Sequence, residues 1–582
     1  MRKQRFVSVN LQKWTRRRRF HISRHIFWVV LVLLMAGNFT YADAQTRPNV
    51  KLVLQVTIDG LRADLLNRYG DGFGKDGFRF LMKKGIVYTN AHYQHANTET
   101  IVGHTTLATG AFPSQHGMIG NVWFDREAGE LTYNIEDPDS PIIQTRENVS
   151  KGEQVDPAQK KSHTQGRSPA VILAPTFGDG LAAYYGGRSK IFGVSGKDRS
   201  AVSMAGHVGK AFWYSTNTGD FVTSTYYYDA YPDWVSKWNA QRKAERYTGK
   251  SWSLLNDAPA YLLADQDDRP YEADLKGYGR VFPHPFGQAN DKLFATRILV
   301  SPVGDQLTLD FSKALIKHEQ LGKDEIPDYL SISFSGVDAV NHFFGPSSLE
   351  NEDVVVQLDR TLADLFSFID KTVGLKHTLV VFAADHGMAD MPEYMTELGY
   401  KAGRLDPDEI VAAANQAGRK FGVDEIVRFF YRPYLYLNDE KIAAEKIDRM
   451  KVEHVIADAL TDLEGISLAV ASSRLSAQQT NPLLEQVRNN YHVSRSGDIY
   501  IIQEPYWFLF DKGPVPAMHG SPWRYDTHVP IVFMGPGIQP KTVHRRVHPV
   551  DVAPTIAALL GVTTPGSAQG MPLEEVLNRK MK

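Results

Sequence analysis

Five short apolar runs, separated by stretches with helical patterning, constrain most strongly what this chain can fold into. They are residues 53–58 (VLQVTI), 191–194 (IFGV), 329–334 (YLSISF), 378–384 (TLVVFAA) and 530–534 (PIVFM). Runs that are apolar along their whole length are typical of strands covered on both faces, as in parallel sheets. We therefore predict an α/β fold, with a mostly parallel central sheet and helices on both of its faces.

Three longer stretches lack this pattern and are rich in Tyr, Asp, Gly and Pro. They lie near residues 123–188, 207–291 and 393–494. None has a linker-like boundary, so we predict that they are insertions that form a cap over the site of one catalytic domain, residues 45–582. The alternative is that they are independent domains.

The amino terminus has the pattern of an export signal. Residues 26–36 (IFWVVLVLLMA) form an uncharged apolar run of 11 residues, with basic residues before it and Ala42-Asp43-Ala44 after it. A membrane span needs about 20 residues, whereas a signal-peptide core needs about 7–15 before a small-residue cleavage site. We predict that residues 1–44 are a signal peptide, that the protein is exported to the periplasm, and that no membrane span remains after cleavage. An uncleaved anchor is the alternative.

The absence of cysteine narrows the possible chemistry. A chain of 582 residues without Cys has no disulfide, no Cys-ligated zinc, no iron–sulfur cluster and no Cys nucleophile, so a metal site must use His and carboxylates. Residues 1–44 carry nine basic residues and one acidic residue, which leaves 56 basic and 65 acidic residues, a net charge of −9, in the rest. This acidity argues against nucleic acid or a membrane surface as the main partner. The oligomeric state is not indicated.

Carboxylates and imidazoles gather at the ends of the predicted strands. In open α/β sheets, ligands bind beyond the carboxyl ends of the strands, so we expect these side chains to share one site. The residues are Asp59 after 53–58, Asp338 and His342 after 329–334, Asp385 and His386 after 378–384, and His519 in the loop before 530–534.

Each of these residues alone has an ordinary explanation, because an Asp after a strand is often a cap or turn residue. The combination of Asp338-x3-His342 with Asp385-His386 is consistent with a two-metal site. Carboxylate and imidazole ligands without thiolates suit zinc better than manganese or iron. Two metals about 4 Å apart suit phosphoryl transfer, because one stabilises the attacking oxygen and the other the leaving oxygen.

Two threonines lie in the segment 97–104 (NTETIVGH), at the start of a predicted helix. Free backbone N–H groups and the positive end of the helix dipole favour an alkoxide or a bound phosphate there. A Thr in such a place is more commonly a simple helix cap. Spacing alone does not decide between capping and catalysis for Thr98 and Thr100.

Several motifs follow one another in a fixed order. They are Val56-Thr57-Ile58-Asp59-Gly60-Leu61-Arg62, the Thr-Glu-Thr-x-x-Gly-His segment, Asp338-x3-His342, Ala384-Asp385-His386-Gly387-Met388 and His519-Gly520. Together they resemble the alkaline phosphatase superfamily, and most closely the bacterial PafA-type alkaline phosphatases of its phosphodiesterase/nucleotide-pyrophosphatase-like branch. The resemblance spans nearly the whole chain after residue 44 and implies an alkaline phosphatase-like fold.

The resemblance also implies roles for individual residues. Thr100 would be the nucleophile, and Asn121 would contact the phosphoryl group. Two Zn²⁺ ions would be bound by two sets of ligands, which are Asp338, His342 and His519 for one ion, and Asp59, Asp385 and His386 with the Thr100 oxygen for the other.

The segment 194–199 (VSGKDR) bears on the choice between monoester and diester. The resemblance implies that Lys197 and Arg199 reach the transferred phosphoryl group in monoesterases, and that diesterases of the branch lack this pair. A monoester dianion has charged non-bridging oxygens that an Arg fork and a Lys point charge complement, whereas a diester carries one charge. The alternative is that Lys197 and Arg199 belong to a charged run on a solvated loop.

The sequence therefore predicts an exported, zinc-dependent phosphate monoesterase that acts on small-molecule phosphate monoesters. The reaction would be a double displacement through phospho-Thr100, which releases inorganic phosphate and an alcohol. The first alternative is a phosphodiesterase or nucleotide pyrophosphatase. A sulfatase is disfavoured, because Thr100 is followed by Ile-Val-Gly and not by the x-P-x-R of a sulfatase motif. A non-catalytic phosphate- or metal-binding protein is the remaining class.

Overall fold

The computed structural model describes residues 49–145, 155–476, 481–509, 513 and 515–577. These residues all fall within one compact unit of the chain, residues 48–582. The predicted signal peptide, residues 1–44, lies outside the described residues. Within the described ranges, no helix combines the length and the apolar character that crossing a membrane requires.

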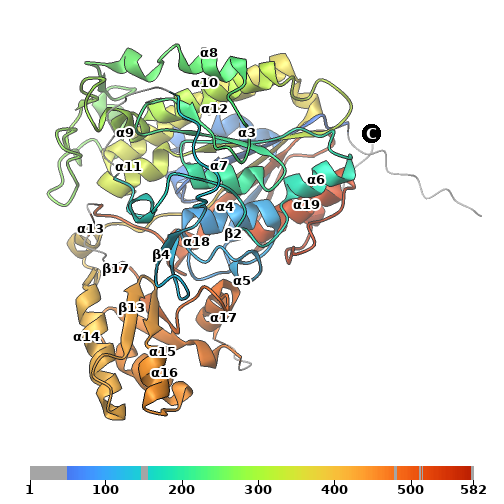
Figure 1. Cartoon of the computed structure of the whole chain (residues 1–582). Helices are drawn as coiled ribbons and strands as arrows, with labels where there is room; N and C mark the ends of the chain where they lie inside the picture. The colour runs from blue at the N-terminus through green and yellow to red at the C-terminus, as the bar shows by residue number, and fades with distance from the viewer. Residues whose placement is uncertain (1–48, 146–154, 477–480, 510–512, 514, 578–582) are drawn as a thin grey trace, which may run out of the picture. The chain divides into compact units, whose positions relative to one another are not determined.

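A nine-stranded sheet forms the centre of the described chain (Figure 1). Its strands, in spatial order, are β19 (Lys541–Val543), β2 (Ile86–His92), β18 (His528–Met534), β11 (Thr378–Ala384), β1 (Leu52–Ile58), β10 (Asp328–Phe334), β5 (Ile191–Ser195), β6 (Lys210–Tyr214) and β7 (Phe221–Val222). The strands from β11 to β6 in this order are parallel to one another. Each of the five apolar runs lies in one strand of this sheet, so the predicted fold class is confirmed.

Helices cover both faces of the sheet. One face packs against α3 (Phe78–Lys84), α10 (Pro302–His318), α11 (Gly336–Phe344) and α12 (Leu349–Thr372), and the other against α4 (Thr100–Thr109), α6 (Phe177–Tyr184), α7 (Asp198–Ala205) and α19 (Val552–Leu560). Successive side chains of a strand point to opposite faces. In β1, Leu54 and Val56 belong to the first hydrophobic core and Val53 to the second. The continuous apolar run therefore reflects burial on both sides.

Strand β18 runs antiparallel to both of its neighbours, β11 and β2. We predicted that its apolar run, like the other four, forms a strand of a mostly parallel sheet. Such a run indicates that both faces of the strand are buried, but it does not indicate the direction of the strand. Because β18 is reversed, the residues before it lie at the same edge of the sheet as the residues after β1, β10 and β11. This direction brings the loop with His519 to that edge.

A second, four-stranded sheet lies largely within the predicted insertion 393–494 (Figure 1). Its strands, in spatial order, are β13 (Val427–Tyr431), β14 (Tyr434–Leu437), β16 (Ile499–Gln503) and β15 (Ile466–Ala471). One face packs against α14 (Pro407–Gly418) and α16 (Arg449–Thr461). The other contributes Tyr434 and Tyr500 to a core that also contains Ile101 of α4 and Trp123. This sheet is therefore packed next to the start of α4.

The predicted insertion 207–291 begins inside the central sheet, since it includes β6 and β7. Strand β7 is the edge strand and β6 is its neighbour, and both are rich in aromatic residues and lack the long β-branched run of the central strands. The rest of this range contains short elements, namely α8 (Asp233–Asn239), β8 (Ser251–Trp252) and β9 (His284–Pro285). The range 123–188 overlaps the hairpin of β3 (Val122–Asp125) and β4 (Glu130–Tyr133) and then enters α6, which covers the central sheet.

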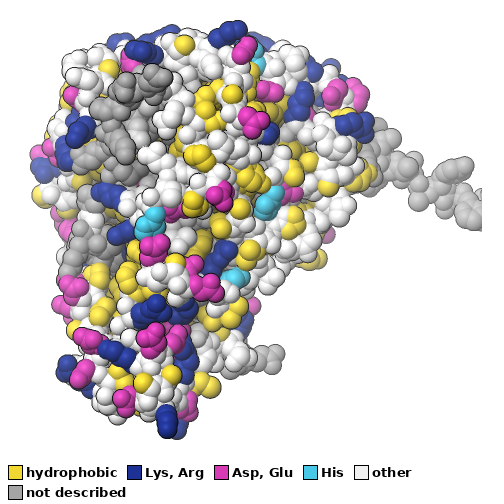
Figure 2. Space-filling model, in the orientation of Figure 1, with side chains coloured by type: hydrophobic (Ala, Val, Ile, Leu, Met, Phe, Trp, Pro, Cys, Tyr) yellow, Lys and Arg dark blue, Asp and Glu magenta, His cyan; other side chains and the backbone are white. Residues whose placement is uncertain are grey.

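Further short helices and strands connect these layers. They are α2 (Leu65–Arg68), α5 (Pro113–His116), α9 (Phe294–Leu299), α13 (Pro392–Glu397), α15 (Asp439–Ala444), α17 (Pro482–Asn490), α18 (Arg524–Thr527), α20 (Glu574–Leu577), β12 (Gly403–Leu405) and β17 (Trp507–Leu509). On the face shown in Figure 2, basic and acidic side chains of the described residues are interspersed. This face therefore lacks the strong field of one sign that a large basic patch would create.

Candidate active site

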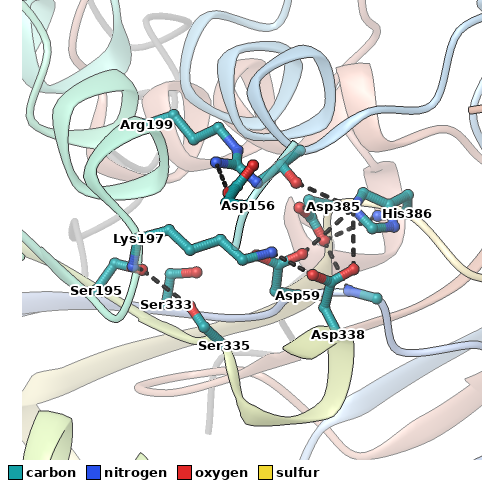
Figure 3. Close-up of polar contacts among 12 residues, drawn as sticks. Asp59, Asp156, Ser195, Lys197, Arg199, Ser333, Ser335, Asp338, Asp385 and His386 are labelled. Carbon is teal, nitrogen blue, oxygen red and sulfur yellow. Dashed lines mark hydrogen bonds and ion pairs between the residues drawn. The ribbon is translucent and has the colours of Figure 1, made fainter. Parts of the chain in front are cut away.

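The site lies at the carboxyl edge of the central sheet. The last residues of β1, β10 and β11 are paired with one another in register. The chain that leaves these three strands therefore brings three carboxylates together, those of Asp59, Asp338 and Asp385 (Figure 3). All three side chains are buried.

Two groups of side chains at this edge have the composition of metal sites. Within each group, one potential ligand atom per residue lies within 4.8 Å of the others. The first group is Asp338, His342 and His519, and the second is Asp59, Asp385 and His386. The residues in each group are those that the sequence resemblance implied. Asp338 also links the groups, because its Oδ1 lies 3.5 Å from Nε2 of His519 and 4.0 Å from Nε2 of His386.

The three histidines present the same ring nitrogen to the site. In each ring, Nδ1 lies 2.7–2.9 Å from a backbone carbonyl oxygen, to which it donates: His342 to Ala517, His386 to Gly387, and His519 to Thr98. In a neutral ring, a proton on Nδ1 leaves the lone pair on Nε2, which faces the carboxylates and is free for a metal ion. Backbone acceptors of this kind fix the ring and the tautomer of metal-binding histidines.

The carboxylates of both groups are short of partners. Both oxygens of Asp59, Oδ1 of Asp338 and Oδ2 of Asp385 are buried and accept no hydrogen bond of good geometry from the residues that the structure describes. A buried charge is costly unless it is paired or coordinates a metal. Carboxylate oxygens with neutral imidazole nitrogens form a donor set that suits zinc. The residues present therefore fit two divalent metal ions.

Lys197 adds a positive charge beside these carboxylates. Its Nζ lies 2.8 Å from Oδ2 of Asp59 and is also paired with Asp338 (Figure 3). Burial raises the pKa of Asp59, but Lys197 and His386 hold it below its usual value. Burial lowers the pKa of His386, whereas Asp385 and Asp59 raise it to about 10. The site therefore attracts positive charge, as a cation site would.

Thr100 is the first residue of α4, and its hydroxyl faces the second ligand group. The Oγ1 atom lies 3.4 Å from Nε2 of His386. The hydroxyl of Thr98 instead donates to the backbone carbonyl of Ser521 (2.9 Å). A hydroxyl at the start of a helix lies near unpaired N–H groups, which favour negative charge. The geometry thus distinguishes two threonines that spacing alone did not.

Asn121 is held against the start of the same helix. Its Oδ1 accepts a hydrogen bond from the backbone N–H of Ile101 (3.1 Å), and its own backbone N–H donates to Oε2 of Glu99 (2.5 Å). Asn121 lines the same cleft as Lys197 and Arg199. The three residues expected to bind the phosphoryl group therefore share one cavity.

Arg199 lies in the first turn of α7 and is buried, with 2% of its surface exposed. Its Nη1 lies 2.7 Å from Oδ2 of Asp156 (Figure 3) and 3.5 Å from the hydroxyl of Tyr133. Among the described residues, its Nε has no hydrogen-bond partner. A buried guanidinium with an unused N–H beside a cleft is suited to an anionic ligand. This burial also contradicts the alternative of a charged run on a solvated loop.

The cleft that joins these residues encloses about 860 Å³, including space open to solvent. It is lined at one end by Asn121, Lys197 and Arg199, and it also reaches His342 and His519. A phosphate ester in this cleft would therefore meet the first ligand group and the three phosphoryl-binding candidates together.

Sequence reasoning missed three residues that contact the predicted ones, namely Glu99, His104 and Asp156, and it missed Arg432, which lines the cleft and pairs with Glu99. Nδ1 of His104 lies 3.0 Å from the carbonyl oxygen of Thr100 and 3.0 Å from Oδ2 of Asp385. Oε1 of Glu99 lies 3.5 Å from Nη1 of Arg432. His104 had a sequence signal, because it follows Thr100 by four residues and so lies on the same helix face. Asp156 and Arg432 are far from their partners along the chain, and no pattern marked them.

The sequence matches the model of the family described as type I phosphodiesterase / nucleotide pyrophosphatase over residues 53–522. The chain belongs to this family. The branch that the sequence motifs predicted is thereby confirmed, and the matched region includes all the predicted site residues.

Relatives in this family are similar along almost their whole length. A protein of Myroides odoratus named calcium-transporting ATPase is 31% identical over 557 residues, which cover 95% of this chain and 99% of that protein. Alkaline phosphatase PafA of Elizabethkingia meningoseptica is 32% identical over 559 residues, with 95% and 99% covered. A crystal structure of wild-type alkaline phosphatase PafA has a TM-score of 0.83 at 31% identity, and covers 92% of this chain and 100% of that one. The predicted likeness to PafA-type alkaline phosphatases is therefore confirmed.

Proposed function

We propose that this family member is an exported, zinc-dependent alkaline phosphatase that hydrolyses phosphate monoesters through a phosphorylated Thr100. One observation carries the proposal: two ligand groups linked through Asp338 lie next to the hydroxyl of Thr100, and the buried cations Lys197 and Arg199 line the adjoining cleft. The 32% identity to alkaline phosphatase PafA supports it. Export and a periplasmic location rest on the sequence pattern of residues 1–44.

The reaction would proceed by two displacements at phosphorus. Two Zn²⁺ ions, when bound to the two ligand groups, would lower the pKa of the Thr100 hydroxyl and stabilise charge on the attacking and leaving oxygens. The Thr100 oxygen attacks in line, and the P–O bond to the alcohol breaks. Water then attacks the phosphorus of phospho-Thr100, which regenerates the hydroxyl and releases inorganic phosphate.

The other residues of the site would hold the phosphoryl oxygens. Lys197, Arg199 and the Asn121 amide line the cleft, where they would meet the non-bridging oxygens. Preorganised donors aimed at developing charge usually supply the largest share of catalysis. Lys197 would move from Asp59 and Asp338 to the substrate once divalent ions neutralise these carboxylates.

The formal charges of the site favour a dianion. Its three buried carboxylates, two divalent ions and Lys197 would sum to about two positive charges, with Arg199 balanced by Asp156. A phosphate monoester carries two negative charges and a diester carries one. The monoester therefore gains more from this arrangement, provided that both cations reach its non-bridging oxygens.

The decisive experiment compares kcat/KM for p-nitrophenyl phosphate and bis-p-nitrophenyl phosphate with the purified, zinc-supplemented protein. We expect the monoester to be preferred by orders of magnitude. Lys197→Ala and Arg199→Ala should each reduce hydrolysis of the monoester far more than hydrolysis of the diester. Equal losses on both substrates would contradict the assigned role of the two cations.

The family description names phosphodiesterases and nucleotide pyrophosphatases, which makes a diesterase the second candidate. A preference for bis-p-nitrophenyl phosphate in the same assay would establish that function instead. Lys197 and Arg199 would then have to serve another purpose, such as neutralising Asp59 and Asp156.

A further inference from the structure

The cleft beside the candidate active site is lined by apolar as well as charged side chains. Its apolar wall is formed by Leu299, Val300, Ala339, Phe343, Val515 and Met518. Leu299 and Met518 are partly exposed and pack against the hydrophobic core under α10 and α11. Their apolar surface therefore remains accessible in the cleft while its base is rigidly supported.

The position of this wall relative to the metal-ligating residues determines which part of a substrate would contact it. Ala339 directly follows Asp338, Phe343 directly follows His342, and Met518 directly precedes His519. Each ligand of the first group therefore has an apolar neighbour that lines the cleft. The Thr100 hydroxyl faces His386 of the second group, so under the proposed mechanism the first group is the one that would stabilise the leaving oxygen. In an in-line displacement the leaving oxygen departs on the side opposite to the attacking oxygen, so the alcohol emerges beside the apolar wall.

Three polar side chains of the cleft, those of Gln159, Tyr214 and Asp156, are engaged with the protein. Nε2 of Gln159 donates to Asp198 (2.8 Å), and the hydroxyl of Tyr214 donates to the backbone carbonyl of Ala295 (3.1 Å). Asp156 is paired with Arg199. These protein groups already have hydrogen-bond partners and are poorly placed to bind the hydroxyls of a sugar. Moving sugar hydroxyls from water to an apolar wall is costly when those hydroxyls remain without hydrogen bonds.

A second phosphate would find no strong site either. Among the described lining residues, the Lys and Arg side chains are Lys197, Arg199 and Arg432. The first two are assigned to the transferred phosphoryl group. Arg432 lies 3.5 Å from the buried carboxylate of Glu99, which offsets its charge. The cleft thus offers one cluster of cations and one apolar surface.

We propose that this cleft selects phosphate monoesters with an apolar alcohol portion, alkyl or aryl, over sugar phosphates and nucleotides. The inference rests on the proposed monoesterase function and names its substrate class. Each methylene of the substrate that is fully removed from water in the complex strengthens binding by about fourfold. Partial exposure of Leu299 and Met518 reduces this effect, so we expect a gain of at least tenfold over four methylenes.

The test uses the zinc-loaded protein and alkyl phosphates of similar leaving-group pKa. We expect kcat/KM for hexyl phosphate to exceed that for ethyl phosphate by at least tenfold, and glucose 6-phosphate to be no better than ethyl phosphate. Leu299→Gln should lower the hexyl-to-ethyl ratio severalfold. The matched control Leu262→Gln, at a side chain that is 64% exposed, should leave the ratio unchanged. A flat or inverted ratio in the native protein would overturn the proposal.

A binding measurement separates this proposal from the proposed function. Ethylphosphonate and hexylphosphonate carry the same dianionic head group and cannot be hydrolysed. Calorimetric titration of the zinc-loaded protein should give a Kd at least tenfold lower for hexylphosphonate. Equal Kd values would overturn the apolar selection even if monoesters are hydrolysed. Tighter binding of hexylphosphonate without hydrolysis of any monoester would support the apolar wall and refute the monoesterase function.

Discussion

Gly103 marks the closest approach between helix α4 and the strand end that carries Asp385. A Cβ atom at Gly103 would lie 2.0 Å from the carbonyl oxygen of Asp385, whereas ordinary contact begins at 3.4 Å. Gly103→Ala therefore requires α4 and Asp385 to separate by about 1.4 Å. The same helix begins with Thr100, so the change would shift a candidate nucleophile against a candidate metal ligand. A misplacement of about 1 Å can cost about 100-fold in rate, and overpacking costs about 1–3 kcal/mol in stability.

The assay measures kcat/KM for p-nitrophenyl phosphate, the thermal midpoint and the bound zinc of Gly103→Ala. We expect a loss of about 100-fold in kcat/KM and a lower midpoint. The control is Gly180→Ala in helix α6, where the nearest atom, the carbonyl oxygen of Thr563, lies 3.4 Å from the new Cβ. That variant should retain full activity and gain about 0.5–1 kcal/mol, because Ala is less flexible than Gly in the unfolded chain. Activity within twofold of the native protein for Gly103→Ala, at an unchanged midpoint, would refute the inferred constraint.

Three further predictions follow from the site. Thr100→Ala should lower kcat by at least about 10³-fold at unchanged zinc content, since the phosphoryl acceptor is lost. Covalent labelling of the denatured protein by phosphate should disappear in the same variant. Persistent turnover would assign the nucleophile to another residue. Asp156→Asn should reduce kcat/KM for the monoester about 10–100-fold and have little effect on kcat/KM for the diester. The reason is that Nη1 of Arg199 loses the charged partner at 2.7 Å that orients it. An equal loss on both substrates would indicate general damage to the fold and contradict this role. Dialysis against a chelator should lower the thermal midpoint of unfolding, and added Zn²⁺ should restore it. An ion present at about 1,000 times its Kd adds about 4 kcal/mol to the free energy of unfolding. An unchanged midpoint would contradict metal binding at the buried carboxylates.

The sequence was informative where a pattern is local. The apolar runs predicted the central strands, and the residues that directly follow them, such as Asp59 and Asp385, are brought together because parallel strands end at the same edge. His519 precedes its strand, and only the antiparallel direction of β18 explains why it joins the others. The sequence placed His519 in the loop before that strand, and its role as a metal ligand came from the family resemblance.

The sequence was less informative where a feature depends on distant partners. Asp156 lies 43 residues before Arg199, with which it pairs, and Arg432 lies far along the chain from Glu99. Charge pairs of this kind are set by tertiary packing, and neither Asp156 nor Arg432 lies in a motif. Strands β6 and β7 were assigned to an insertion because they are short and aromatic, although Phe212 and Phe221 belong to the core on one face of the sheet and Trp213 and Val222 to the core on the other. Position in the sheet, and not composition, determines their role.

The reversed strand β18 has a consequence for biogenesis. The first ligand group combines Asp338 and His342 with His519, and the second begins at Asp59, so the complete site depends on residues 460 positions apart. Contacts between such distant parts of a chain form late, because a very large loop must close before they contribute. A nascent chain is therefore without its full complement of ligands until almost all of it has been synthesised. If the protein crosses a membrane unfolded, the catalytic centre would assemble only on the far side, where the metal must then be supplied.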